Sequence, residues 1–138
     1  FELEMEMIAG TVKVRDLPEE WNDRFEAFIG ITPTSDTVGV LQDVHWSSGL
    51  LGYFPTYAIG NLLAAQYYRK ALEAHPNIPD EIAAGRFDTL LGWLRENILQ
   101  HGRKFTAEEL TQRVTGESID CKYYMQYLYD KYTDIYQL

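Results

Sequence analysis

Apolar and polar residues alternate along this chain mostly at helical spacing, with Gly, Pro and capping residues between the periodic stretches. The stretch Phe1 to Ala9 has this periodicity and is followed by Gly10, so we expect it to be the end of a helix. A second helix is expected to begin after the capping residue Asp16, with Pro18 in its first turn, and to stop before Gly30. The segment that follows, Ile31 to Val38, reads as a loop.

Most of the remaining chain is also predicted to be helical. Thr106 and Glu109 form a predicted capping box, and the sequence IPDEIAAG reads as a short helical turn. At most a short extended strip is expected near residues 11–14 and 49–54, and no repeat or internal domain boundary is visible. We therefore expect a mainly α, multi-helix fold in which residues 1–138 form a single unit. The further helices are predicted at about Pro55 to Ala74, Arg86 to His101, Thr106 to Thr115, and from near Asp120 toward the end.

The predicted helix from Pro55 to Ala74 is apolar nearly all round, so it requires neighbours on several sides. We expect it to be the most buried helix, and we expect self-association wherever those neighbours are lacking. The stretch from Trp46 to Tyr68 contains no Asp, Glu, Lys or Arg and is long enough to span a membrane. Its serines, glycines and Pro55 interrupt any single spanning helix, however, which favours a buried core segment.

Composition and charge narrow the function classes. The chain has 138 residues, 46% of them hydrophobic, which is typical of a globular domain. Its formal net charge of −9 disfavours binding to nucleic acid or to anionic lipid surfaces. Cys121 is the single cysteine, so an intrachain disulfide is impossible and a reducing cytoplasm is expected. Because the chain starts without Met in what reads as the middle of a helix, we expect a segment of a longer protein.

The candidate chemistry lies between Gly39 and Tyr57. Asp43, His45, Trp46, Tyr53 and Tyr57 gather there in a Gly-rich and nearly uncharged context, and tyrosines on an irregular turn can direct a hydroxyl at a ligand. The pattern alone favours a structural histidine at position 45 over a functional one.

The other histidines and tyrosines are expected to be structural. His75 precedes a proline, and His101 lies in the last turn of a helix. The tyrosine-rich sequence near the C-terminus reads as an amphipathic packing helix. The sequence contains no HExxH motif and no other histidine or carboxylate pair at metal-ligand spacing that includes His45, so we expect no metal site carried wholly by this chain.

A family resemblance adds what spacing does not. The sequence GVLQDVHW, residues 39–46, is similar to the GxxQDxHW signature of the carboxypeptidase Taq family of thermostable metallocarboxypeptidases. The agreement is complete at every specified position of the signature. The resemblance continues through FELE, DLPEEWN, GYFPTYAIGNLLAAQ, GRKFTAEEL and VTGES, and so covers essentially the whole chain.

The resemblance implies the C-terminal portion of a much longer all-α metallopeptidase. Members of that family bind zinc or a similar divalent ion, such as cobalt, through an HExxH helix and a downstream glutamate, and use an arginine motif for the carboxylate of the substrate. None of these motifs is present here. The complete enzyme is expected to remove C-terminal amino acids from peptides with a metal-activated water, and the isolated chain is expected to be inactive and free of tightly bound metal.

This portion is then expected to form a wall of the substrate groove. The sequence HWSSGLLGYFPTY also resembles, more distantly, the layout of thimet oligopeptidase-like enzymes. That similarity implies that His45, with Tyr53 or Tyr57, binds the peptide and donates hydrogen bonds to the oxyanion. Gln42, Asp43 and Trp46 are expected to hold the loop, with Asp43 orienting His45. The alternative is a non-catalytic α-helical interaction module in which the same loop serves packing alone.

Overall fold

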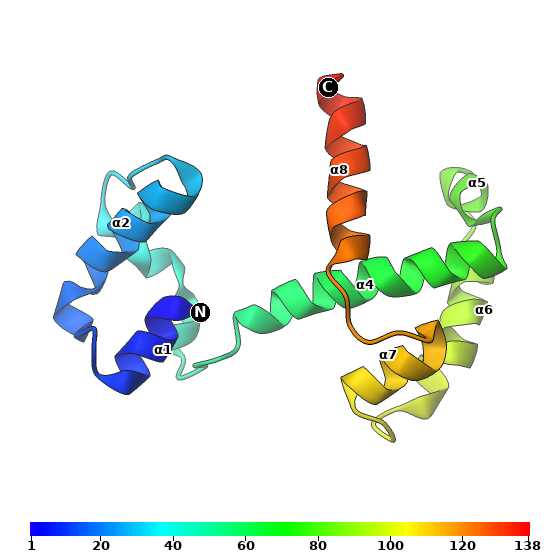
Figure 1. Ribbon diagram of the computed structural model, residues 1–138, viewed down its shortest axis with the longest axis horizontal. Helices are drawn as coiled ribbons and strands as arrows, with labels where there is room; N and C mark the ends of the chain where they lie inside the picture. The colour runs from blue at the N-terminus through cyan, green and yellow to red at the C-terminus, as the bar shows by residue number, and fades with distance from the viewer. The chain divides into compact units, whose positions relative to one another are not determined.

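The computed structural model describes residues 1–138 and contains eight α-helices, four short 3₁₀-helices and no β-strand (Figure 1). The mainly α class predicted from the sequence is confirmed. Two compact units make up the chain, Phe1–Tyr57 and Ala58–Leu138, and each is described by itself. Whether the chain is a single domain stays a prediction.

The first unit contains α1 (Glu2–Ala9), α2 (Leu17–Ile29) and the short helix α3 (Val44–Ser47). The 3₁₀-helices Val14–Asp16, Asp36–Val38 and Val40–Gln42 lie between them. As predicted, α1 and α2 each end at a glycine in the left-handed conformation, Gly10 with φ 74° and Gly30 with φ 78°. Asp16 is the N-cap of α2, but its side chain makes no capping hydrogen bond.

The core of the first unit joins α1, α2 and the loop that follows. Leu3, Leu17 and Val40 are buried together, and they are packed against by Met7, Val12, Trp21 and Trp46. On the surface, Arg24 of α2 pairs with Glu6 of α1 at 2.5 Å and with Glu20 at 3.4 Å. These contacts fix α1 and α2 as the platform on which the loop from Gly39 onward rests.

The second unit contains most of α4 (Pro55–Ala74), together with α5 (Ile78–Ala83), α6 (Asp88–Asn97), α7 (Ala107–Thr115) and α8 (Lys122–Tyr136). Pro55 opens α4 as the sequence predicts. The predicted helix Arg86 to His101 is shorter than expected, because α6 ends at Asn97 and a 3₁₀-helix, Leu99–His101, follows. The predicted capping box of α7 is present.

The core of this unit is built around Ala71, Ile78 and Trp93. A fully buried glutamine adds a polar tie: Gln66 Nε2 donates to Thr115 Oγ1 at 3.2 Å and to the carbonyl oxygen of Ser118 at 3.0 Å. Gln66 Oε1 accepts from the backbone N–H of Asp120 at 3.1 Å. Both ends of the amide are therefore satisfied, and the tie fixes the segment between α7 and α8 onto α4.

Residues 11–14 and 49–54, where at most a short extended strip is expected, form bends, turns and the start of a 3₁₀-helix, and neither segment is a strand. The expected burial of α4 is wrong. Helix α4 is not the most buried helix of the chain: only Gln66 and Ala71 are buried, whereas Ile59 is 44% exposed.

Helix α8, like α4, is less buried than its sequence predicts. In Figure 1 it runs away from the other helices of its unit, and it has no buried residue. Tyr129 and Tyr136 are 69% and 66% exposed, so they do not pack into a core of this chain as the helical periodicity predicted. No helix of the structure is both long and apolar enough to cross a membrane.

Candidate functional site

The loop that carries the candidate residues begins at a glycine in close contact with its neighbours. A Cβ at Gly39 would lie 3.1 Å from Pro33 Cβ and 3.1 Å from the backbone oxygen of Ser35. The residue at this position therefore has to be small for the chain to turn into the 3₁₀-helix Val40–Gln42. The Gln42 side chain in turn donates to the backbone oxygen of Thr37, which closes the loop on itself.

Asp43 organises the start of α3 and the ring of His45 at the same time. Its Oδ1 atom accepts from the backbone N–H of His45 at 3.0 Å, as an N-cap residue does, and lies 3.0 Å from His45 Nδ1. An ionised carboxylate only accepts hydrogen bonds, so Nδ1 is the donor. This leaves His45 Nε2 free to accept from a ligand when the ring is neutral, and to donate when both nitrogens are protonated.

Three aromatic rings surround His45. The Tyr53 ring stacks on it with the centroids 5.5 Å apart and 23° between the planes, while Phe54 and Tyr57 meet it edge-on at 5.4 and 5.8 Å. Tyr53 and Tyr57 also contact each other edge-to-face at 5.6 Å. These spacings are those of favourable aromatic pairs, so the cluster holds the imidazole in one orientation.

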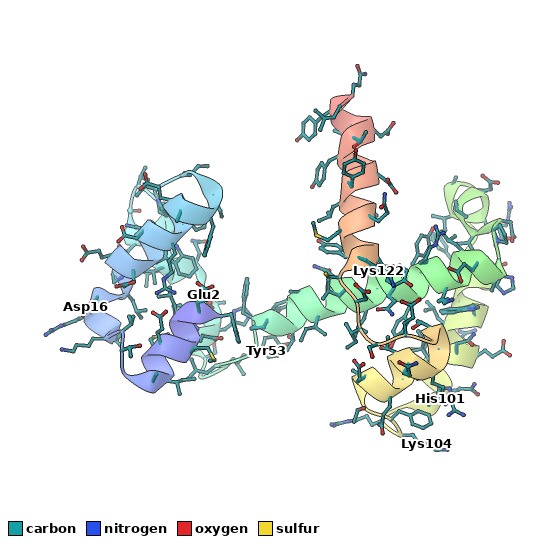
Figure 2. The ribbon with its side chains drawn as sticks, in the orientation of Figure 1. Glu2, Asp16, Tyr53, His101, Lys104 and Lys122 are labelled. Carbon is teal, nitrogen blue, oxygen red and sulfur yellow. The ribbon has the colours of Figure 1, made fainter.

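The exposed fraction differs among the side chains of this cluster. The side chains of Asp43 and His45 are 8% and 16% exposed, whereas Tyr53 and Tyr57 are 44% and 53% exposed. Tyr53 lies in the segment just before α4, where Figure 2 labels it. His45, which Asp43 holds in place, therefore lies beneath two accessible tyrosines. The tyrosine hydroxyls can donate hydrogen bonds to a polar ligand.

An apolar cavity of about 650 Å³ adjoins the loop within the first unit. Its wall comes from α1, α2 and the loop, and includes Trp21, Phe25, Phe28, Asp43, Trp46 and Phe54. Arg24 also lines it, but the guanidinium pairs with Glu2, Glu6 and Glu20, and the hydrogen bond that it donates to Glu6 is the main cause of the raised pKa of Arg24. The cavity thus offers apolar surface rather than a free positive charge.

The residues present do not form a metal site. No group of three or more His, Cys, Asp or Glu side chains in residues 1–138 is placed to hold an ion. His45 Nδ1 is bonded to Asp43, so this pair offers a metal one nitrogen at most.

The structure brings together all the residues singled out in the sequence and adds two more. His45, Tyr53 and Tyr57 lie in one cluster, and the side chains of Gln42 and Asp43 bond to backbone atoms beside it. The roles of these residues and of Trp46 in holding the loop and in catalysis stay predictions. The additional residues are Phe54, whose ring meets both His45 and Tyr57, and Glu4.

Glu4 could have been found from the pattern of its own helix. It is an acidic residue next to Leu3 and three before Met7, on the apolar side of α1. Its carboxylate bonds the indole of Trp46, which is distant in sequence.

His101, which the sequence predicts to be structural, lies outside this cluster. His101 lies in the second unit, where Figure 2 labels it, and meets the Phe105 ring edge-on at 5.4 Å. This contact agrees with the structural role predicted for it.

Comparison with known proteins specifies the family of this all-α segment. Residues 1–132 match the family model described as carboxypeptidase Taq (M32) metallopeptidase. The chain belongs to this family.

Sequence relatives and solved structures support the family membership. The chain is 41% identical over 132 residues to thermostable carboxypeptidase 1 of Pyrococcus furiosus, covering 96% of this chain and 26% of that protein. It is 38% identical over 138 residues to carboxypeptidase 1 of Bacillus subtilis, covering all of this chain and 28% of the relative. The crystal structure of the M32 carboxypeptidase from Deinococcus radiodurans superposes with a TM-score of 0.93 at 45% identity, over 100% of this chain and 28% of that one. The chain thus spans about a quarter of the length of these relatives.

Proposed function

We propose that this chain forms one wall of the substrate groove in a metallocarboxypeptidase that removes C-terminal amino acids from peptides. Membership of the M32 family and the carboxypeptidase names of its relatives support this activity. The metal is proposed to be zinc or another divalent ion, such as cobalt, held by residues outside this chain. A cytoplasmic location is proposed because Cys121 is a free thiol.

The observation that carries the proposal is the histidine held by Asp43 beneath two accessible tyrosines. In peptide hydrolysis negative charge develops on the carbonyl oxygen, and donors held ready for that charge lower the barrier. Tyr53 and Tyr57 supply such donors from one rigid cluster, and His45 Nε2 joins them when both ring nitrogens are protonated. Ring contacts and the carboxylate of Asp43 restrict the motion of His45. Gln42 and Trp46 keep the backbone of the loop in place.

Kinetics of the full-length enzyme that contains this chain test the proposal. His45→Ala is expected to lower kcat/KM on the order of 100-fold, because it removes a group that faces the substrate. Asp43→Asn is expected to cause a smaller fall, since the amide can still contact the ring but no longer holds it through a carboxylate. His101→Ala, a histidine of the second unit, is the matched control and should leave kcat/KM unchanged. Equal activity of all three variants would contradict the proposal.

A second function, a non-catalytic helical interaction module, is favoured by one observation. The first turns of α4 and most of α8 expose large apolar side chains, including Ile59 and Tyr129. A pure interaction module has no need of the loop chemistry, so under this alternative His45→Ala would leave binding to the partner unchanged and the full-length protein would have no peptidase activity to lose.

A further inference from the structure

Glu4 is a buried carboxylate at the back of the candidate site. It lies in α1, is 3% exposed, and sits beside the core formed by Leu3, Leu17 and Val40. Its Oε1 atom accepts two hydrogen bonds, from Trp46 Nε1 at 2.9 Å and from the backbone N–H of Gly52 at 3.0 Å. Hydrogen bonds to an ionised acceptor are about twice as strong as neutral ones.

The two donors bracket the turn of the candidate site. Trp46 directly follows His45, and Gly52 directly precedes Tyr53. The turn between them is exposed, and Gly49 and Gly52 adopt positive φ angles of 72° and 76°, so its backbone has wide conformational freedom. One carboxylate oxygen of α1 therefore ties both ends of this turn and sets the distance between His45 and Tyr53.

Stability alone does not account for a carboxylate at this position. The second oxygen of Glu4, Oε2, is buried without a hydrogen-bond partner in the protein. Burying a charged group with unpaired hydrogen-bonding capacity costs free energy. An ion kept under these conditions is best explained by the geometry that it imposes on its two donors.

We propose that Glu4 is a positioning residue, which holds His45 and Tyr53 at the separation that the substrate requires; this inference rests on the proposed function. Glu4 touches neither substrate nor metal in this scheme and acts through Trp46 and Gly52. Misplacement of a catalytic group by about 1 Å can cost on the order of 100-fold in rate, so a loosened turn is expected to lower kcat more than it raises KM.

Two variants in the full-length enzyme test the inference. Glu4→Gln keeps the shape and one neutral acceptor, and is expected to lower kcat about tenfold with KM nearly unchanged. Glu4→Leu removes the acceptor and leaves the Trp46 indole and the Gly52 N–H without this partner, so a larger loss is expected. Glu2→Gln, an exposed glutamate of the same helix, is the matched control and should keep the parental kcat.

A spectroscopic readout separates positioning from mere loss of fold. The indole N–H resonance of Trp46, assigned through Trp46→Phe, is expected to shift upfield in Glu4→Gln while the melting temperature stays close to that of the parent. A shifted indole resonance with parental kcat would overturn the inference, as would an unshifted resonance. If Glu4→Leu does not fold, Glu4→Gln alone decides. If His45→Ala and the tyrosine variants also keep full activity, the proposed function itself has failed; if only the Glu4 variants do, this inference alone has failed.

Discussion

At the scale of single residues, the loop depends on contacts that admit few substitutions. Gly39 is enclosed by Pro33 and Ser35, and Asp43 serves the helix N-cap and the imidazole with the same oxygen atom. The signature residues are therefore needed by the local geometry of the loop, before any substrate is considered.

Replacement of Gly39 tests the requirement for a small residue. Gly39→Ala is expected to destabilise the protein by about 1–3 kcal/mol, because the added Cβ would lie 3.1 Å from both Pro33 Cβ and the backbone oxygen of Ser35, and these atoms have to move. Gly60→Ala is the matched control: no atom lies within 4 Å of the added Cβ in α4, so helix propensity should make it neutral or slightly stabilising. Urea unfolding of the three proteins measures the difference. Equal midpoints for Gly39→Ala and the parent would contradict this account of the loop.

At the scale of helices, most boundaries could be predicted from the sequence, with the end of α6 as an exception, but burial could not. Pro55, Gly30 and the Thr106–Glu109 box act within a few residues of their own position, so local chemistry predicts them correctly. The exposure of Ile59 and Tyr129 depends on which segments lie opposite, which no local pattern reports. The link from Glu4 to Trp46 was missed for the same reason, because it joins residues far apart in sequence.

The capping box of α7 makes helix stability depend on pH. The pKa of Glu109 is lowered because the backbone N–H and the hydroxyl of Thr106 both donate to its carboxylate. A group with a lowered folded pKa stabilises the protein at neutral pH, and this contribution is lost as the pH falls through that pKa. Glu109→Gln should therefore melt at a lower temperature than the parent at pH 7, and the two should converge in acid. A gap that stays constant between neutral and acid pH would contradict the prediction.

At the scale of the whole molecule, much apolar surface is left uncovered. Along α4 the exposed side chains begin with Tyr57 and Ile59, and along α8 they include Tyr129, Ile135 and Tyr136. Monomeric proteins rarely expose contiguous apolar patches beyond a few hundred Å². The proposal that this chain forms a homo-oligomer follows from this surface and from the apolar circumference of α4.

Association of the 138-residue chain is accordingly expected. Light scattering across a wide concentration range should give a mass above the 16.0 kDa of one chain, and Ile59→Glu should shift the distribution toward the monomer. Lys104→Glu, a charge change elsewhere in the second unit, serves as the control for altered net charge. A clean monomer at every concentration would count against this prediction.

The central claim is that the tyrosines above His45 act on the substrate, and Tyr57 tests it most directly. Its ring meets His45 edge-on and is 53% exposed, so Tyr57→Phe removes a hydroxyl with little change of shape. Steady-state kinetics of the full-length enzyme should show kcat lowered on the order of 100- to 1,000-fold, equivalent to about 2.7–4 kcal/mol, with KM little changed. Tyr53→Phe is measured beside it, and Tyr129→Phe of α8 is the control. Near-parental kcat in both Tyr57→Phe and Tyr53→Phe, with unchanged metal content, would show that the loop is structural.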